Sequence, residues 1–430
     1  MMRTLRHPAV WLLAALLLVV LWKGPQWSAP AVDASAAASA APADAATVER
    51  GQYLARIGNC AFCHTARGGD AFAGGRAIDT PFGSVTSSNI TPDRNFGIGQ
   101  WTAGEFWRAM HHGVSREGRL LYPAFPYTSY THLTRQDSDA LWAYLQTVPA
   151  STRSNTEHAL PWPYSTQAAL WAWRTLYFRA GEAPDALAQT PPAKTDTAAW
   201  TRGAYLTQGL GHCFECHSSR NALGAVQGLG QGSVLPGSRW YAPSLLDRAQ
   251  ASVADWSEDE VVAFLTRGSS ARGLASGPMA EVVLHGTQYL QPQDARAMAT
   301  YLRALPATTS QPLAALQPQD VSGLLRAGRK LYEQHCADCH GSQGQGVAGV
   351  YPALAGNRAA SMENTHNLGQ AVLRGGFAPA TAGNPRPYGM PPFMMVLSDA
   401  EIATVLSYVR HEWGNTGGLV TEFDITQLRR

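Results

Sequence analysis

The sequence has little charge, and the charge it has is balanced. Charged residues make up 15% of the 430 positions, against about 25% in an average soluble domain. Its 33 basic and 31 acidic side chains give a formal net charge of +2 without a block of one sign, so nothing favours a nucleic-acid partner. Hydrophobic residues make up 45%, which argues against disorder. At roughly 150 residues per domain, the length predicts about three domains.

No cysteine lies outside one repeated pattern. The six cysteines form three pairs, each with two residues between its members and a histidine directly after: Cys60, Cys63 and His64; Cys213, Cys216 and His217; Cys336, Cys339 and His340. This pattern is typical of covalent c-type haem attachment. Two thiols so spaced reach the two vinyl groups on one porphyrin edge, and the histidine offers its imidazole to the iron as proximal ligand. The sequence therefore predicts three covalently bound haem c groups.

Two other interpretations of paired cysteines fit less well. A single pair is typical of a redox dithiol or of half a zinc site. Zinc, however, needs four ligands, and three pairs do not close an even number of four-thiolate sites. A disulfide framework would scatter its cysteines over loops instead of repeating one local triplet.

The N-terminal 46 residues are predicted to export the chain. Arg3 and Arg6 precede an apolar run, Ala9 to Trp22, which is shorter than the ~20 residues that a membrane-spanning helix needs. The run is either a cleaved signal or an uncleaved membrane anchor, followed by a flexible tether rich in alanine, serine and proline from Ser28 to Ala46. No second apolar run reaches membrane-spanning length.

The rest of the chain repeats itself around the three motifs. Each motif follows a predicted helix that contains a glycine and precedes a closing helix that contains a tyrosine, the pairs being Gly51 and Tyr144, Gly203 and Tyr301, and Gly328 and Tyr408. A glycine without Cβ lets the aromatic residue approach its backbone. We therefore expect an all-α protein with long loops, whose domains span 47–190, 198–307 and 319–430.

Shorter signals mark the ends of these helices. Thr102 with Glu105, and Ser257 with Glu260, form capping boxes that open a middle helix ending at Gly113 or Gly268. In the third repeat Asn367 to Gly375 takes this place. Thr134 with Asp137, and Ser398 with Glu401, are expected to open closing helices.

Methionines in glycine- and proline-containing loops are candidates for the second axial ligand. Methionine ligation gives a six-coordinate haem of raised potential that is suited to electron transfer. Met279 is the candidate in the second repeat, where Met298 is assigned to the core. In the third repeat it is Met390, with Met394 and Met395 as competitors.

The first repeat departs from this pattern. The position that corresponds to Met279 falls at Ala124 or Phe125, and phenylalanine does not ligate iron. Met110 aligns with the middle helix. The first haem is therefore left with three alternatives: Met110 after a local rearrangement, a vacant sixth position, or a histidine from the set His111, His112 and His132.

Eight short stretches resemble one family, the triheme cytochrome c subunits of membrane-bound periplasmic dehydrogenases. They lie within a match from about Val48 to Val420, at 72–75, 80–83, 89–93, 97–101, 121–127, 211–213, 390–393 and 413–415. The resemblance implies three tandem class I-type cytochrome c domains. It also implies that Met279 and Met390 are distal ligands. Many members have methionine where this chain has Phe125, and the phenylalanine form is expected in the branch that serves molybdenum hydroxylases.

The same resemblance implies an electron relay with no catalytic chemistry of its own. Electrons would pass from a flavin, quinoprotein or molybdenum dehydrogenase subunit, acting on alcohols, aldehydes or related substrates, to ubiquinone or an oxidase. The expected location is the periplasmic face of the cytoplasmic membrane. Two alternatives are a peroxidase-like multihaem enzyme with an open iron at the first haem, and a free-standing electron shuttle. The surroundings from Leu121 to Tyr130 are too apolar for the former, and three haems exceed the needs of the latter.

Overall fold

The structure is a computed structural model that describes residues 43–181, 190–310 and 318–429. The chain divides into two compact units, Met1–Gly51 with Cys63–Glu182 and Gln52–Phe62 with Ala183–Arg430. The predicted signal or anchor at Ala9 to Trp22 lies outside the described residues. Within the described residues, none of the helices combines the length and the apolar character needed to cross a membrane.

The part of the chain before residue 182 consists of short helices and one β-hairpin, joined by long loops. Its elements are α2 (Ala45–Ile57), α3 (Cys60–His64), β1 (Ala77–Thr80), β2 (Gly83–Thr86), α4 (Ala103–His112), α5 (Tyr127–Tyr130), α6 (Arg135–Leu145) and α7 (Gln167–Tyr177). Strands β1 and β2 pair antiparallel, with Ile78 opposite Val85.

The part after residue 189 continues with short helices and short strands. The elements up to residue 303 are α8 (Thr197–Ala204), η2 (Tyr205–Leu210), α9 (Cys213–Cys216), β3 (Ser219–Arg220), β4 (Val226–Gly228), β5 (Ser233–Val234), β6 (Tyr241–Ala242), α10 (Glu258–Arg267), β7 (Ser269–Ser270), β8 (Gly273–Leu274), α11 (Pro278–His285), η3 (Thr287–Tyr289) and α12 (Pro292–Arg303). The remaining elements are α13 (Pro318–His335), α14 (Ala337–His340), α15 (Arg358–Ser361), α16 (His366–Arg374), β9 (Gly376–Phe377), β10 (Gly389–Met390), α17 (Asp399–His411) and α18 (Glu422–Arg429). All strands of the described chain form two-stranded pairs. The expectation of a largely helical protein is confirmed.

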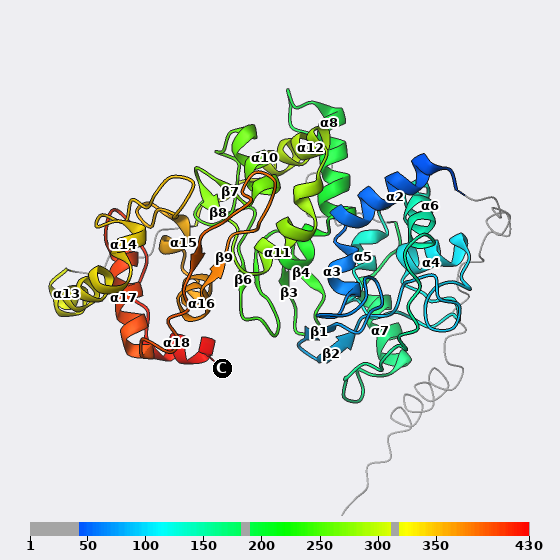
Figure 1. Ribbon diagram of the computed structural model, residues 1–430, viewed down its shortest axis with the longest axis horizontal. Coiled ribbons are helices and arrows are strands. Elements are labelled where there is room, and N and C mark those ends of the chain that lie inside the picture. Colours follow the sequence, from blue (N-terminus) through cyan, green and yellow to red (C-terminus); the bar gives the residue numbers. More distant parts are fainter. Residues whose placement is uncertain (1–42, 182–189, 311–317, 430) are drawn as a thin grey trace, which may run out of the picture. The chain divides into compact units, whose positions relative to one another are not determined.

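The predicted contact between a glycine and the tyrosine of the closing helix occurs three times. A Cβ placed on Gly51, Gly203 or Gly328 would lie 2.8, 2.7 or 2.5 Å from the Cβ of Tyr144, Tyr301 or Tyr408, respectively. The helices that carry these residues pack in pairs, α8 with α12 and α13 with α17 (Figure 1). Any side chain larger than hydrogen would force the two helices of a pair apart.

The predicted helix starts are mostly found. Capping boxes open α4 at Thr102, α10 at Ser257 and α17 at Ser398. Helix α6 also begins after its predicted cap, Thr134. Its carboxylate at Asp137 takes a different role, however, and accepts a hydrogen bond from Nε of Arg50 at 2.7 Å.

Each helix pair after residue 189 has its own small core. Trp200 of α8 and Tyr301 of α12 pack with Phe214, which lies between the second pair of cysteines. Tyr332 of α13 and Tyr408 of α17 pack with the partly buried Cys336. Aromatic residues of the paired helices therefore contact the chain segments that carry the cysteines. The division into three domains at 47–190, 198–307 and 319–430 stays a prediction.

Candidate haem sites

Each of the three cysteine motifs forms a short helix, α3, α9 or α14, together with its flanking cap residue where the helix stops short of the motif. In the first two, the residue before the first cysteine has left-handed backbone geometry, with φ of 57° at Asn59 and 38° at His212. In the third, α13 runs to His335, and Cys336 follows directly as the N-cap of α14. The chain thus enters the first two motifs through a turn and the third along a helix.

The cysteines are reduced thiols, and burial raises the pKa of three of them. None of the six described cysteines is in a disulfide. Burial raises the pKa of Cys213 to about 12 and that of Cys336 to about 11, and burial also raises the pKa of Cys63. Within the described ranges, no group of three or more His, Cys, Asp or Glu side chains is arranged to hold a metal ion, so the four-ligand set of a structural zinc site is not found there.

Each motif histidine is oriented by a backbone carbonyl. The Nδ1 atoms of His64, His217 and His340 lie 2.7, 2.7 and 2.9 Å from the carbonyl oxygens of Ser88, Pro243 and Pro352, respectively. A carbonyl only accepts hydrogen bonds, so Nδ1 carries the proton and donates it. The lone pair is then on Nε2, the atom that binds iron when Nδ1 is bonded in this way.

The electrostatics of these histidines agrees with that tautomer. Burial lowers the pKa of His64, His217 and His340, against the smaller opposing effect of the carbonyl hydrogen bond. The imidazoles are therefore neutral at neutral pH and available as ligands. Reduced thiols, a neutral imidazole and a fixed Nδ1 bond form a donor set that fits covalent haem at all three motifs.

The methionines of the third repeat differ in their surroundings. Met390 lies in β10, opposite Gly376 of β9, and is half-buried. Met394 packs against the core cluster built from α16, α17 and α18, whereas the side chain of Met395 is 89% exposed. Met394 is thus part of the core packing and Met395 faces solvent, so Met390 stays the candidate ligand among the three.

Met279 lies in the first turn of α11 and is half-buried. Gly277, just before this helix, has a φ of 52°, and a Cβ on it would lie 2.5 Å from the ring of Trp240. This close approach fixes the start of α11 against the indole. Met298 is 3% exposed within α12, in agreement with its assignment to the core.

The alternatives for the first haem lie in and near α4. Met110 is 5% exposed in this helix, which is where the alignment placed it. The ring of His111 stacks on Trp107 at 4.4 Å and lies 4.7 Å from that of His112. Burial, with the nearby His111, lowers the pKa of His112 to about 4. Phe125 packs 5.5 Å from Tyr130.

The carbonyls that orient the histidines were not predicted from the sequence. A signal for two of them exists: Pro243 and Pro352 are each followed two positions later by leucine, Leu245 and Leu354. The first repeat has Ser88 in this place, without proline. The sequence separation between histidine and acceptor does not identify the acceptor either, since it is 24, 26 and 12 residues in the three sites.

Comparison with known proteins gives the family. A family model described as cytochrome c matches residues 325–413. The cytochrome c subunit of alcohol dehydrogenase (quinone) from Gluconacetobacter polyoxogenes is 36% identical over 402 residues, which are 89% of this chain and 84% of that protein. The gluconate 2-dehydrogenase cytochrome c subunit of Pantoea cypripedii is also 36% identical, over 90% of each chain.

A further relative is longer. One of the subunits of nicotinate dehydrogenase from Pseudomonas putida is 40% identical over 376 residues, which are 86% of this chain but 30% of that protein. The resemblance inferred from the motifs is confirmed by the two relatives that match over nearly their whole length. This chain belongs to the family of cytochrome c subunits of dehydrogenase complexes.

Proposed function

We propose that this chain is an electron-transfer subunit that carries three covalent haem c groups and relays electrons from a dehydrogenase catalytic subunit to the respiratory chain. The observation that supports the number three is the repetition of one local geometry. Each of the three motifs has two cysteines at the same spacing and a histidine whose Nδ1 donates to a carbonyl. A single matching motif would support one haem and say nothing of the others.

The chain's residues have separate tasks at each site. The two cysteines hold the porphyrin through thioether bonds, and the histidine presents Nε2 on the proximal side. The carbonyl of Ser88, Pro243 or Pro352 holds the ring orientation. A bound haem supplies one-electron storage at its iron.

The distal sides are proposed to differ. Met279 serves the second haem and Met390 the third, since each is half-buried and lies within two residues of a glycine, Gly277 or Gly389. The first haem has Phe125 at the corresponding place and so lacks this ligand. Methionine raises the potential of a haem, and the first haem is expected to differ in potential from the other two.

The partners are proposed from the relatives. The donor is a flavin, quinoprotein or molybdenum catalytic subunit, and the acceptor is ubiquinone or an oxidase. The place is the periplasmic face of the cytoplasmic membrane, with Ala9 to Trp22 as signal or anchor. N-terminal sequencing of the membrane-bound protein separates these two roles: a start at Met1 indicates an anchor, and a start between Trp27 and Ala46 indicates a removed signal.

The haem count is the direct test. The full chain, exported in a host with haem-attachment machinery, should gain the mass of three haems and show three haems per chain in the pyridine haemochrome assay. Two or fewer haems in a cysteine-complete preparation, or bound zinc, would overturn the proposal. Oxidised membranes should then show haem reduction on addition of a dehydrogenase substrate such as ethanol, gluconate or nicotinate, and reoxidation by a short-chain ubiquinone.

A further inference from the structure

The side chain of Asn367 binds both backbone polar groups of one distant residue, Tyr241. Its Oδ1 accepts from the amide of Tyr241 at 2.9 Å, and its Nδ2 donates to the carbonyl of Tyr241 at 2.8 Å. Asn367 is in the first turn of α16, which belongs to the third predicted domain. Tyr241 begins β6 in the second predicted domain. The side-chain amide of Asn367 thus satisfies the backbone N–H and C=O of Tyr241, as a neighbouring β-strand would, although the two residues are 126 positions apart in sequence.

Two neighbours of Asn367 hold the same segment of chain. Nδ1 of His366 lies 3.0 Å from the carbonyl oxygen of Arg239. The buried side chain of Gln370 donates from Nε2 to the carbonyl of Ser238 at 3.5 Å. The N-terminal half of α16 therefore fixes residues 238–241 through side chains that bond to backbone.

The segment held in this way leads directly to the proximal histidine of the second site. Pro243 lies two residues after Tyr241, and its carbonyl accepts the Nδ1 hydrogen bond of His217 at 2.7 Å. On its other side, the amide of Ser244 donates to Oε1 of Gln250 at 2.9 Å. The acceptor carbonyl is thus held between an anchor from its own domain, Gln250, and one from the next domain, Asn367.

The other two sites use an asparagine of their own domain. Beside Ser88, the amide of Asn89 donates to Oδ1 of Asn155 at 2.7 Å. Beyond Pro352, Asn415 donates from Nδ2 to the carbonyl of Leu354 at 2.9 Å. Among the three described acceptor loops, the one at His217 is the one whose asparagine comes from another predicted domain.

We propose that Asn367 is a positioning residue for His217: its two bonds to the backbone of Tyr241, made from the third predicted domain, hold the acceptor loop and so set the potential of the second haem. The inference rests on the proposed haem at His217. A well-placed acceptor for the Nδ1 proton raises the basicity of the imidazole. A more basic ligand stabilises the ferric iron, which lowers the potential. Loss of the Asn367 bonds to Tyr241 of β6 should therefore weaken the hydrogen bond between Nδ1 of His217 and the carbonyl of Pro243, and so raise the potential of the second haem alone.

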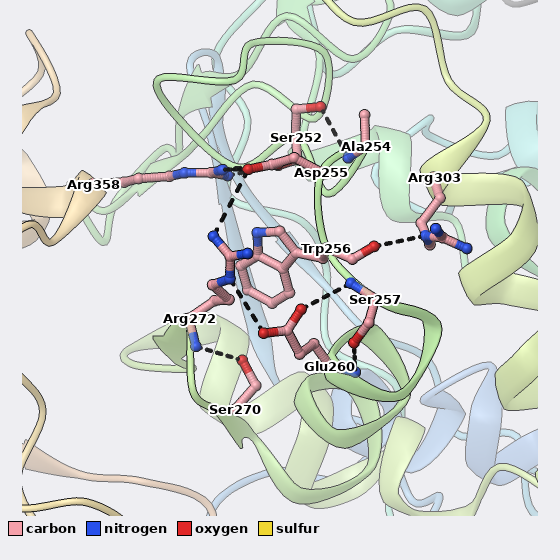
Figure 2. A network of polar contacts seen from close by, with 10 residues as sticks. All are labelled: Ser252, Ala254, Asp255, Trp256, Ser257, Glu260, Ser270, Arg272, Arg303 and Arg358. Carbon is pink, nitrogen blue, oxygen red and sulfur yellow. Dashed lines mark hydrogen bonds and ion pairs between the residues drawn. The ribbon is translucent and has the colours of Figure 1, made fainter.

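A contact elsewhere between the same two domains provides the control. Arg358 at the start of α15 donates to both carboxylate oxygens of Asp255 at 2.8 Å and to the carbonyl of Ser252 (Figure 2). The partners of Arg358 lie outside the segment 238–244. Replacing Arg358 weakens the docking of the domains without touching the loop that orients His217.

The experiment compares four variants of the full chain: Asn367→Ala, Asn367→Leu, Arg358→Gln and Asn155→Ala. Haem stoichiometry comes first, since fewer than three haems in the unsubstituted chain contradicts the proposed function and not this inference. Spectroelectrochemical titration then resolves the three midpoints. Both Asn367 variants should raise one midpoint and leave two unchanged. Asn155→Ala should raise a different midpoint, and Arg358→Gln should raise none.

Leucine keeps the branched shape of asparagine, so a shift shared by the alanine and leucine variants comes from the lost hydrogen bonds and not from a cavity. Three outcomes overturn the inference. The first is that both Asn367 variants retain three haems and show unchanged midpoints. The second is that the affected midpoint falls, and the third is that Arg358→Gln raises the same midpoint as much as the Asn367 variants do. The electron paramagnetic resonance signal of the affected haem gives a second readout, which should change in the Asn367 variants and not in Arg358→Gln.

Discussion

Arg202 donates two hydrogen bonds to the buried carboxylate of Asp294, from Nε to Oδ1 at 2.8 Å and from Nη2 to Oδ2 at 2.7 Å. Arg202 directly precedes Gly203 in α8, and Asp294 lies in the first turn of α12. The pair therefore joins the two helices beside the glycine that lets them approach. Arg50, which precedes Gly51, likewise joins α2 to α6, with both Nε and Nη2 directed at Oδ1 of Asp137.

Replacing Arg202 with methionine should lower the free energy of unfolding by about 1–3 kcal/mol, because the buried Asp294 loses its cationic partner. Urea unfolding followed by circular dichroism measures the change. Arg329→Met is the control, since Arg329 is 58% exposed and lies 4.0 Å from Glu412, and it should change the free energy by less than about 0.5 kcal/mol. Equal effects of the two substitutions would contradict the structural role of the Arg202 pair.

Two glycines of α13 should respond to alanine in opposite directions. Gly328→Ala places a methyl group 2.5 Å from Cβ of Tyr408 and should destabilise the protein by about 1–3 kcal/mol. Apart from the neighbouring backbone of its own helix, the nearest described atom to an ideal Cβ on Gly323 is Nη2 of Arg326, at 4.0 Å, so Gly323→Ala should stabilise the protein by up to ~1 kcal/mol through helix propensity. Urea midpoints of the two variants check both signs. A Gly328→Ala protein as stable as the parent would show that the helix pair tolerates separation.

Met390→Leu should open one iron to carbon monoxide and lower one midpoint, while the covalent haem count stays at three. Leucine conserves volume but offers no sulfur to the iron. Met394→Leu is the matched control, because Met394 packs against the core cluster of α16, α17 and α18. Carbon monoxide difference spectra of the reduced proteins distinguish the two. A response to Met394→Leu and none to Met390→Leu would move the ligand to Met394.

Met110→Leu should leave the spectrum and the midpoint of the first haem unchanged. Met110 is buried within α4, and a volume-conserving exchange in a packed helix costs less than about 1.5 kcal/mol. The same carbon monoxide spectra and a redox titration provide the measurement. New carbon monoxide binding, or a strong fall of one midpoint, would identify Met110 as the distal ligand of that haem.

The contribution of Asp255 to stability should disappear in acid. Burial alone would raise the pKa of Asp255, but the hydrogen bonds and charge of Arg358, with the nearby Arg272, outweigh it and hold the pKa below its usual value. Arg272 is itself bonded to Glu260 (Figure 2). Because the folded-state pKa is depressed, the stabilisation is present above the unfolded pKa of about 3.9 and is lost as the pH falls through the lower folded value.

The difference in unfolding free energy between the parent and Asp255→Asn measures this effect. It should be about 0.2–1 kcal/mol above pH 5, as for other partly exposed pairs, and should shrink toward zero below pH 4. Groups unaffected by the substitution cancel in the difference. A difference that is constant from pH 7 to pH 3 would show that Asp255 acts without its charge.

The candidate haem sites could be predicted because their chemistry is local. Two thiols and an imidazole within five consecutive residues place the attachment and proximal groups on one turn of chain, whatever the rest of the fold does. The capping boxes at Thr102, Ser257 and Ser398 were predictable for the same reason, since their hydrogen bonds span three residues. The approach of Gly203 to Tyr301 followed from a repeat that occurs three times.

Other features depend on how distant segments pack. The acceptor carbonyls of Ser88, Pro243 and Pro352 lie at different separations from their histidines, because the length of each intervening loop differs. The different surroundings of Met394 and Met395 follow from the docking of α18 beside α17. The bond between Asn367 and Tyr241 crosses 126 residues. The amino-acid sequence alone determined the candidate haem-binding groups, since their chemistry is local. Tertiary structure decided what orients them, since polar backbone groups bond to whichever side chain the packing brings near.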